Sequence, residues 1–150
     1  MSVGKNAVYV PSDRGLFAID RATGRKRWQA RFSPVAGDTA TVAGQLILFA
    51  GTEITTGQSG VFALDAASGA LQWRIDLPRA PGARTGSAAA NGLFFVSSWD
   101  ASQDDTAGGT PTLHAYDLAN GQERWVFRAD GATAAGQGRA PKAWWPAAPR

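Results

Sequence analysis

Short apolar runs of four residues recur along the chain, and turn-forming residues such as Gly, Pro, Ser or Asp bound each run. The first set comprises Ala7–Val10, Leu46–Phe49 and Leu93–Val96. A second set follows in the same order, at Leu16–Ile19, Val61–Leu64 and Leu113–Tyr116. Short apolar runs between turn signals are typical of β-strands. The pattern therefore predicts three successive units, each with a pair of neighbouring strands.

A fixed motif, Asp-x-x-(Thr/Ser/Asn)-Gly-x-x-x-Trp, ends each unit. Its members are Asp20, Gly24 and Trp28, then Asp65, Gly69 and Trp73, then Asp117, Gly121 and Trp125. The first two Trp are 45 residues apart and the second two are 52 apart. Repeats of roughly 40–50 residues with several short strands are typical of propeller blades. We therefore predict an all-β fold of β-propeller blades with four antiparallel strands each, about three blades being present.

The motif residues have predictable structural roles. An Asp at the start of a hairpin turn accepts hydrogen bonds from backbone N–H groups, and a Gly supplies a positive φ. The Trp follows on the outermost strand and is expected to pack between adjacent blades, burying roughly 150–250 Å². Ala18, Ala63 and Ala115 recur two positions before the Asp. Neighbouring blades are expected to approach closely at these small residues.

The strands divide the chain into blades at about 2–32, 39–77 and 87–128. The innermost strand of each blade is weakly marked by the sequence. Thr39–Val42 and Ser87–Ala90 occupy the expected places, and Ser2–Val3 would be a truncated first strand. The remaining segment 129–150 is rich in Ala, Gly and Pro and is predicted to be irregular.

Composition excludes several kinds of site. The absence of cysteine rules out disulfides, thiolate zinc sites, iron–sulfur clusters and thiol nucleophiles. The net charge is +3 with scattered Lys and Arg, which provides no basic face for nucleic acid. No stretch approaches the ~20 apolar residues that span a bilayer. Because Met1–Val10 lacks the signal-peptide pattern, we expect a cytoplasmic chain or an export signal upstream.

The repeat resembles the pyrroloquinoline-quinone-like (PQQ-like) β-propeller repeat. The matching residues in the first copy are Val8-Tyr9-Val10, Phe17-Ala18-Ile19-Asp20, Thr23-Gly24 and Trp28, and the other two copies match at equivalent positions. The resemblance covers residues 2 to 128 approximately. That family includes quinoprotein dehydrogenases, a lipoprotein that helps to assemble outer-membrane β-barrels, and sensor regions of bacterial kinases. The resemblance implies a periplasmic or extracellular location.

The resemblance also bears on cofactors. It implies PQQ with Ca²⁺ only for the dehydrogenase members, which carry a vicinal cysteine pair, a Trp platform under the quinone, Ca²⁺ ligands and a catalytic Asp. This chain has no cysteine, its regular Trp are assigned to blade packing, and its motif Asp are assigned to turns. The sequence itself therefore indicates no cofactor, and we transfer no quinone-site residue and no catalytic residue to it.

A candidate binding loop lies between the second and third strands of the third unit. The equivalent connections lengthen along the chain, from Pro11–Arg14 through Ala50–Ser59 to Ser97–Pro111. Loops on one side of a rigid scaffold commonly carry binding functions. The longest contains Trp99, Asp100, Asp104 and Asp105. The three carboxylates are the ligands that Ca²⁺ prefers, but their spacing is not that of a dedicated calcium loop, so a solvated polar loop is favoured. Trp99 would stack on a ligand or, as we favour, pack on a neighbouring blade.

The single histidine, His114, aligns with Phe17 and Phe62. It is expected to replace a packing aromatic residue on a strand, because no Ser or Asp partner can be placed beside it for catalysis.

Three blades do not close a ring, since propellers typically have about four to eight. We expect the chain to be part of a longer propeller, with ring closure by self-association through exposed blade faces as the alternative. The favoured function is a non-catalytic binding or scaffolding module for a protein partner or further blades. The alternatives are part of a PQQ-dependent dehydrogenase, and a kinase sensor region or outer-membrane assembly lipoprotein.

Overall fold

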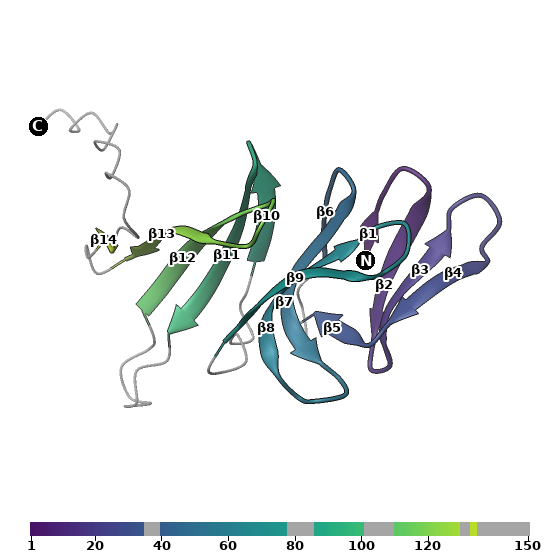
Figure 1. Ribbon diagram of the computed structural model, residues 1–150, viewed down its shortest axis with the longest axis horizontal. Helices are drawn as coiled ribbons and strands as arrows, with labels where there is room; N and C mark the ends of the chain where they lie inside the picture. The colour runs from purple at the N-terminus through teal and green to yellow at the C-terminus, as the bar shows by residue number, and fades with distance from the viewer. Residues whose placement is uncertain (35–39, 78–85, 101–109, 130–132, 135–150) are drawn as a thin grey trace, which may run out of the picture.

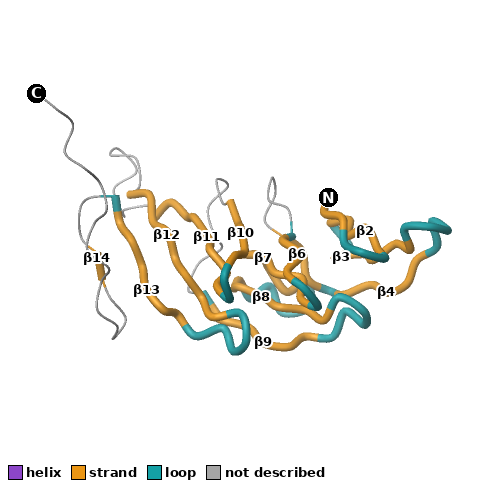
Figure 2. Tube along the Cα trace, turned by 90° about the horizontal axis from the view of Figure 1, so that it is seen from above, coloured by secondary structure: helices purple, strands orange, loops and turns teal. Residues whose placement is uncertain are grey.

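A computed structural model of the chain describes residues 1–34, 40–77, 86–100, 110–129 and 133–134. These residues form three antiparallel sheets that lie side by side in chain order (Figures 1 and 2). The described part of the chain contains strands and turns and no helix. This arrangement confirms the predicted all-β class, that of a partial propeller with three blades.

The strands follow one another in space as in sequence, apart from one short strand in the second sheet. The first sheet has the order β1 (Ser2–Val3), β2 (Ala7–Ser12), β3 (Gly15–Asp20) and β4 (Lys26–Ala30). The second contains β5 (Phe32–Pro34), β6 (Thr41–Ala43), β7 (Leu46–Glu53), β8 (Ser59–Asp65) and β9 (Leu71–Asp76). The third has the order β10 (Gly86–Ala90), β11 (Leu93–Asp100), β12 (Thr110–Asp117), β13 (Glu123–Arg128) and β14 (Thr133–Ala134).

Strands β5 and β6 together occupy one edge of β7. Phe32 pairs with Glu53 near one end of β7, and Thr41 pairs with Leu48 nearer the other end. Phe32, the last residue of the range predicted for the first blade, thus pairs within the second sheet. Of the tail 129–150, the structure describes only residue 129 and β14, and the rest lies outside the described residues.

The strands extend further into the connections than the sequence predicts. Strand β7 continues to Glu53 and β11 continues to Asp100, so that part of each predicted loop is paired backbone. Because the added residues are paired with the neighbouring strand, they lengthen the regular part of both hairpins. The β7–β8 connection and the ends of β11 and β12 lie along the lower edge of the sheets in Figure 1.

A bulge interrupts the outer strand of every blade at the same place. The register shifts after Ala18 in the first blade, after Ala63 in the second and after Ala115 in the third. Each of these alanines pairs with the motif Trp of its own blade. An extra residue in one strand bends it and increases its twist. The bulge therefore changes the direction of the outer strand next to the motif Trp.

The core lies between the sheets in two layers. The first layer joins Tyr9, Leu16 and Ala18 of the first sheet with Ile47, Phe49, Phe62 and Leu64 of the second. The second layer joins Leu48, Ala50, Val61 and Ala63 of the second sheet with Phe94, Val96 and Tyr116 of the third. Both faces of the middle sheet are thus buried, and this sheet holds its neighbours together through apolar contact.

Candidate functional site

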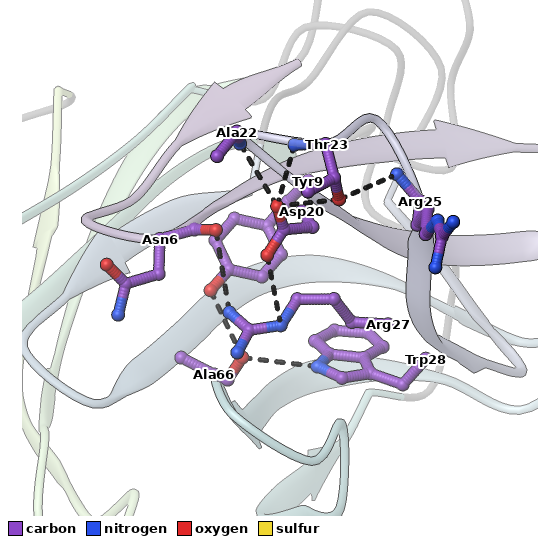
Figure 3. A network of polar contacts seen from close by, with 9 residues as sticks. All are labelled: Asn6, Tyr9, Asp20, Ala22, Thr23, Arg25, Arg27, Trp28 and Ala66. Atoms are coloured by element: carbon purple, nitrogen blue, oxygen red, sulfur yellow. Dashed lines mark hydrogen bonds and ion pairs between the residues drawn. The ribbon is translucent and has the colours of Figure 1, made fainter.

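The Asp of the motif organises the turn between the third and fourth strands of its blade. In the first blade, Asp20 Oδ1 accepts hydrogen bonds from Ala22 N (3.1 Å), Thr23 N (2.9 Å) and Thr23 Oγ1 (2.9 Å), as Figure 3 shows. The backbone closes the turn through Gly24 N to Asp20 O at 2.9 Å. An Asp side chain that binds the backbone two and three residues on is a common way to fix a tight turn.

The same turn recurs in the other blades. Asp65 Oδ1 accepts hydrogen bonds from Ala67 N, Ser68 N and Ser68 Oγ at 3.1, 2.8 and 2.7 Å. In the third blade, Ala119 N donates to Asp117 Oδ1 at 2.8 Å, and Asn120 replaces the hydroxyl residue. The three carboxylates thus hold the backbone of their turns, which is the role that the motif predicts for them.

The hydrogen bonds lower the pKa of all three carboxyl groups. For Asp20 the largest cause is the Thr23 backbone N–H, and for Asp65 it is the Ser68 hydroxyl. The pKa of Asp117 is lowered mainly by the Arg124 side chain, whose Nη2 lies 2.5 Å from Asp117 Oδ2. Stabilising the charged form in this way makes each Asp a weaker base, which does not suit a general base near neutral pH.

The motif Trp of one blade docks on the motif turn of the next. Trp28 Nε1 donates a 3.2 Å hydrogen bond to the carbonyl oxygen of Ala66, the residue after the motif Asp of the second blade. Tyr9 Oη donates to the same oxygen at 3.1 Å (Figure 3). The indole also covers Gly69, where a Cβ would lie 2.6 Å from Trp28 Cε3. Only Gly leaves room for the ring at this position.

The second and third blades repeat this contact. Trp73 Nε1 donates to the Leu118 carbonyl oxygen at 2.9 Å, and a Cβ on Gly121 would lie 2.6 Å from Trp73 Cε3. Each docking contact therefore consists of an indole, a glycine and the carbonyl after the motif Asp. The motif Trp and Gly thus act between blades, whereas the motif Asp holds the turn within its own blade.

A fourth turn with the same residue spacing lies on the opposite edge of the second blade, and a motif that begins with Asp does not include it. Glu53 N donates to Gln58 O, Gly57 N donates to Glu53 O, and Thr56 Oγ1 donates to Glu53 Oε2 at 3.0 Å. The spacing Glu-x-x-Thr-Gly repeats that of the motif with Glu in place of Asp. A search that allowed either acidic residue would have found it.

This fourth turn closes the β7–β8 hairpin and holds a polar network. Arg74 Nη1 lies 3.1 Å from Glu53 Oε2, and Arg74 Nε lies 3.2 Å from Asp76 Oδ1. Ile54, the residue after Glu53, is 39 % exposed. Its backbone N–H donates to Arg31 O at 2.9 Å. The hairpin tip is thus held on a rigid scaffold, where loops commonly carry binding functions. We call the edge that carries the β2–β3, β7–β8 and β11–β12 connections the loop edge.

The candidate binding loop falls largely outside the described residues. Backbone pairing places Trp99 opposite Pro111 and Asp100 opposite Thr110, at the ends of β11 and β12. The side chains of Trp99 and Asp100, and all of Asp104 and Asp105, lie outside what the structure describes, so the loop stays a prediction. Among the described residues, no group of three or more His, Asp or Glu side chains converges as metal ligands would.

His114 lies on β12, and its environment is polar on one side and aromatic on the other. Its Nδ1 is 2.7 Å from Glu123 Oε1, and its ring stacks on Tyr116 with centroids 5.9 Å apart. Burial is the main cause that raises the pKa of Tyr116, and the charge of Glu123 raises it further. The histidine thus packs where the other blades carry Phe17 and Phe62.

Comparison with known proteins accounts for the repeated geometry. The sequence profile of a PQQ-repeat family, described as outer membrane protein assembly factor BamB, matches residues 1–92 and again residues 57–141. The chain belongs to this PQQ-like β-propeller repeat family. Overlapping matches are expected when one profile can align on successive blades of a BamB-like repeat. The family resemblance inferred from the motif is thereby confirmed. No curated protein matches the chain.

Solved structures share the fold of this BamB-like chain. BamB from Moraxella catarrhalis is 22 % identical with a TM-score of 0.57, over 82 % of this chain and 33 % of that one. Quinohemoprotein alcohol dehydrogenase from Comamonas testosteroni is 17 % identical with a TM-score of 0.60, over 84 % and 20 %. A europium-containing methanol dehydrogenase is 17 % identical with a TM-score of 0.61, over 84 % and 23 %.

At these identities the likeness concerns the fold. The chain spans a fifth to a third of the length of these structures. Within its described residues, the chain has no helix that is long and apolar enough to cross a membrane.

Proposed function

We propose that this chain is a non-catalytic binding module that presents its loop edge to a protein partner. The observation that carries the proposal is the β7–β8 hairpin, in which Glu53 and Thr56 fix a tip that exposes Ile54. A rigid scaffold with connections of different length along one edge is the usual architecture of a binding surface. The BamB relative, named as an outer membrane protein assembly factor, makes a protein of the bacterial envelope the favoured partner.

The chemistry of the motif residues supports a scaffold over a dehydrogenase. Asp20, Asp65 and Asp117 are hydrogen-bonded within turns, and their pKa values are lowered. The indoles of Trp28 and Trp73 lie against the glycine turns of the next blade, which supports a packing function for both rings. We therefore assign these residues to the turns and to blade packing, and we assign no step through a calcium–quinone cofactor to them.

Site-specific photo-crosslinking tests the proposed edge. A benzophenone amino acid replaces Ile54, and a matched variant carries it at Ala67, which is exposed on the opposite edge of the same blade. In cells of the source organism, we expect one discrete protein adduct from position 54 and none from position 67. Equal labelling at both positions would contradict the assignment of the loop edge.

Titration with PQQ and Ca²⁺ tests the non-catalytic part of the proposal. We expect the absorption spectrum of the quinone to stay unchanged when the purified chain is added. A spectral shift at micromolar concentration that requires Ca²⁺ would contradict the scaffold function and favour the dehydrogenase alternative. Fractionation of the same cells tests the proposed periplasmic or extracellular location.

A further inference from the structure

The positive charge of the chain is concentrated in its first blade. Residues 1–34 contain seven Lys and Arg against two Asp, which gives a charge of +5, whereas residues 35–150 contain eight against ten, which gives −2. Most of these cations lie at the edge of the first sheet opposite the loop edge. There, residues 4–6 connect β1 to β2, and the motif turn connects β3 to β4.

Two hydrogen bonds to one backbone oxygen hold these two connections together. Arg21 N donates to Asn6 O at 3.1 Å. Arg27 Nη1 donates to the same oxygen at 3.5 Å (Figure 3). Lys5, the residue before Asn6, therefore lies beside the motif turn, although it is 16 positions from Arg21 in the sequence. The fold thus gathers cations that are scattered along the chain. We call Lys5, Arg25, Lys26 and Arg27 the basic corner, and Arg21 lies in the same turn.

The basic corner is open to solvent. All four of its residues are exposed. The side chains of Lys5, Arg25 and Lys26 make no hydrogen bond or ion pair with any residue that the structure describes. Arg27 Nε lies 4.0 Å from Asp20 Oδ2, and Asp20 Oδ1 is occupied by the bonds of the turn. Four cations therefore face one carboxylate, and three of the four have no described partner.

The packing of neighbouring blades leaves this corner uncovered. The turns correspond between blades, because Ala66 N donates to Gln45 O and Leu118 N donates to Gly92 O, as Arg21 N donates to Asn6 O. The equivalent positions are Gly44, Ala70, Leu71 and Gln72 in the second blade, and Asn91, Gln122, Glu123 and Arg124 in the third. All eight are exposed, although another sheet packs against each of these blades. A blade packed on the first sheet in the same way would leave the basic corner exposed too.

The charge at this corner is a property of the first blade alone. The four equivalent residues of the second blade are uncharged, and in the third blade the charges of Glu123 and Arg124 are opposite. The turn has the same backbone closure in all three blades, so it does not need these cations. The free cations of the first blade are therefore available to a partner.

The side chains of the corner favour a partner that binds through charge. The other exposed residues of its turns are small or polar, namely Asn6, Ala22, Thr23 and Gly24. The aromatic rings beside the corner in Figure 3, Tyr9 and Trp28, donate hydrogen bonds to Ala66 of the next blade. Protein interfaces depend on buried aromatic or apolar anchors, and single-stranded nucleic acids stack on aromatic rings. Anionic lipid surfaces attract clustered Lys and Arg without either feature.

We propose that the basic corner binds the surface of a membrane that contains anionic phospholipids. The cations of the two turns would contact the phosphate groups of the lipids, and the protein would rest on the bilayer without inserting into it. The loop edge, at the other end of the strands, would then face away from the membrane. This orientation leaves Ile54 accessible to a protein.

Co-sedimentation of the purified chain with lipid vesicles tests the proposal. We expect binding to vesicles of phosphatidylcholine mixed with phosphatidylglycerol, no binding to phosphatidylcholine alone, and release at high salt. The double variant Arg25→Gln with Lys26→Gln should bind about twenty-five-fold more weakly, because each basic residue at the surface contributes roughly fivefold. Gln122 stands at the position of Arg25 in the third blade, so the turn accepts glutamine.

The matched control is the double variant Arg14→Gln with Arg31→Gln. It removes the same net charge from two exposed residues toward the loop edge. The six-residue strand β3 between the two edges is about 20 Å long, which is beyond the screening length of roughly 10 Å at 0.1 M salt. Vesicle binding should therefore change by less than about twofold. Urea denaturation midpoints establish that both double variants are folded.

Three outcomes would overturn the proposal. The first is a wild type that does not bind anionic vesicles at low salt, and the second is an equal loss of binding in both double variants. The third is tighter binding to duplex DNA or to polyglutamate than to the vesicles, at equal anionic charge and with the same dependence on Arg25 and Lys26. That result would assign the corner to a nucleic acid or to an acidic protein. The basic corner and Ile54 lie on opposite edges, so these outcomes are independent of the function proposed for the loop edge.

Discussion

The indole N–H of Trp73 donates a 2.9 Å hydrogen bond to the backbone carbonyl of Leu118, 45 residues further along the chain and in the next sheet. Trp28 and Ala66 have the same relationship at 3.2 Å. Backbone hydrogen bonds hold each sheet together internally, whereas these contacts, with the two apolar layers, hold one sheet to the next. The stability of the row therefore depends on a small number of side chains that repeat once per blade.

Trp73→Phe should remove the hydrogen bond of this contact together with part of the ring that covers Gly121. Phenylalanine keeps an aromatic ring but has no N–H, so the Leu118 carbonyl loses its donor. The free energy of unfolding should fall by about 1 kcal/mol, the usual cost of leaving a partly buried carbonyl unpaired. Urea denaturation measures this, with Gln72→Ala as the control, since Gln72 is the exposed neighbour of the Trp. An unchanged midpoint would show that ring packing alone holds the blades.

Gly69→Ala should be more damaging than Gly57→Ala, although both residues have a positive φ of similar size. An alanine in this conformation costs about 1 kcal/mol for the backbone alone. At Gly69 the new Cβ would also lie 2.6 Å from the Trp28 ring and displace it, whereas at Gly57 it meets no described atom within 4 Å. Thermal unfolding of the two variants compares these costs directly. Equal destabilisation would contradict the docking of Trp28 on this turn.

Acid should destabilise the motif turns in a predictable direction. The pKa of Asp65 is lowered in the folded chain, mainly by the Ser68 hydroxyl. Its contribution to stability is therefore full above the unfolded-state pKa of about 4 and is lost as the pH falls through the lower folded-state pKa. Asp65→Asn keeps an Oδ1 acceptor but has no proton to gain.

The comparison requires denaturation midpoints of Asp65→Asn and the wild type over a series of pH values. The stability difference between them should be constant near neutrality and should shrink below a pH of about 4. Asp13→Asn, a change to an exposed residue outside the motif, serves as the control for the altered net charge. A difference that does not change with pH would contradict the role given to the Asp65 carboxylate.

The sequence predicts the repeated elements well because their causes are local. A turn whose Asp binds backbone two and three residues on needs only the right residues at fixed spacing, and three copies make the spacing visible. The fold class and the family follow from the same repeat. The fourth turn shares the spacing and the backbone closure, but its Glu53 carboxylate accepts from the Thr56 hydroxyl, and a motif that begins with Asp does not include it.

Other features depend on contacts that no local pattern encodes. The docking of Trp28 on Gly69 joins residues 41 positions apart, and the pattern predicted packing between blades without naming the glycine or the carbonyl. The strand that begins at Phe32 could not be assigned either, because three residues carry no periodicity and their pairing with β7 is a tertiary choice.

Phe62→Ala should be among the most destabilising single changes in the chain. Phe62 is 0 % exposed between the first two sheets, with its ring centroid 5.0 Å from that of Phe32 and 5.6 Å from that of Phe49. Removing a fully buried ring costs about 3–5 kcal/mol, because the transfer free energy is lost and a cavity remains. Leu71→Ala is the control, since Leu71 is apolar but 41 % exposed, and a surface change of this kind should cost less than about 1 kcal/mol. Urea denaturation of both variants measures the difference. Similar midpoints would mean that the first two blades are not held by this apolar layer, and their cohesion would then rest on polar contacts such as those of Trp28 and Tyr9 with Ala66.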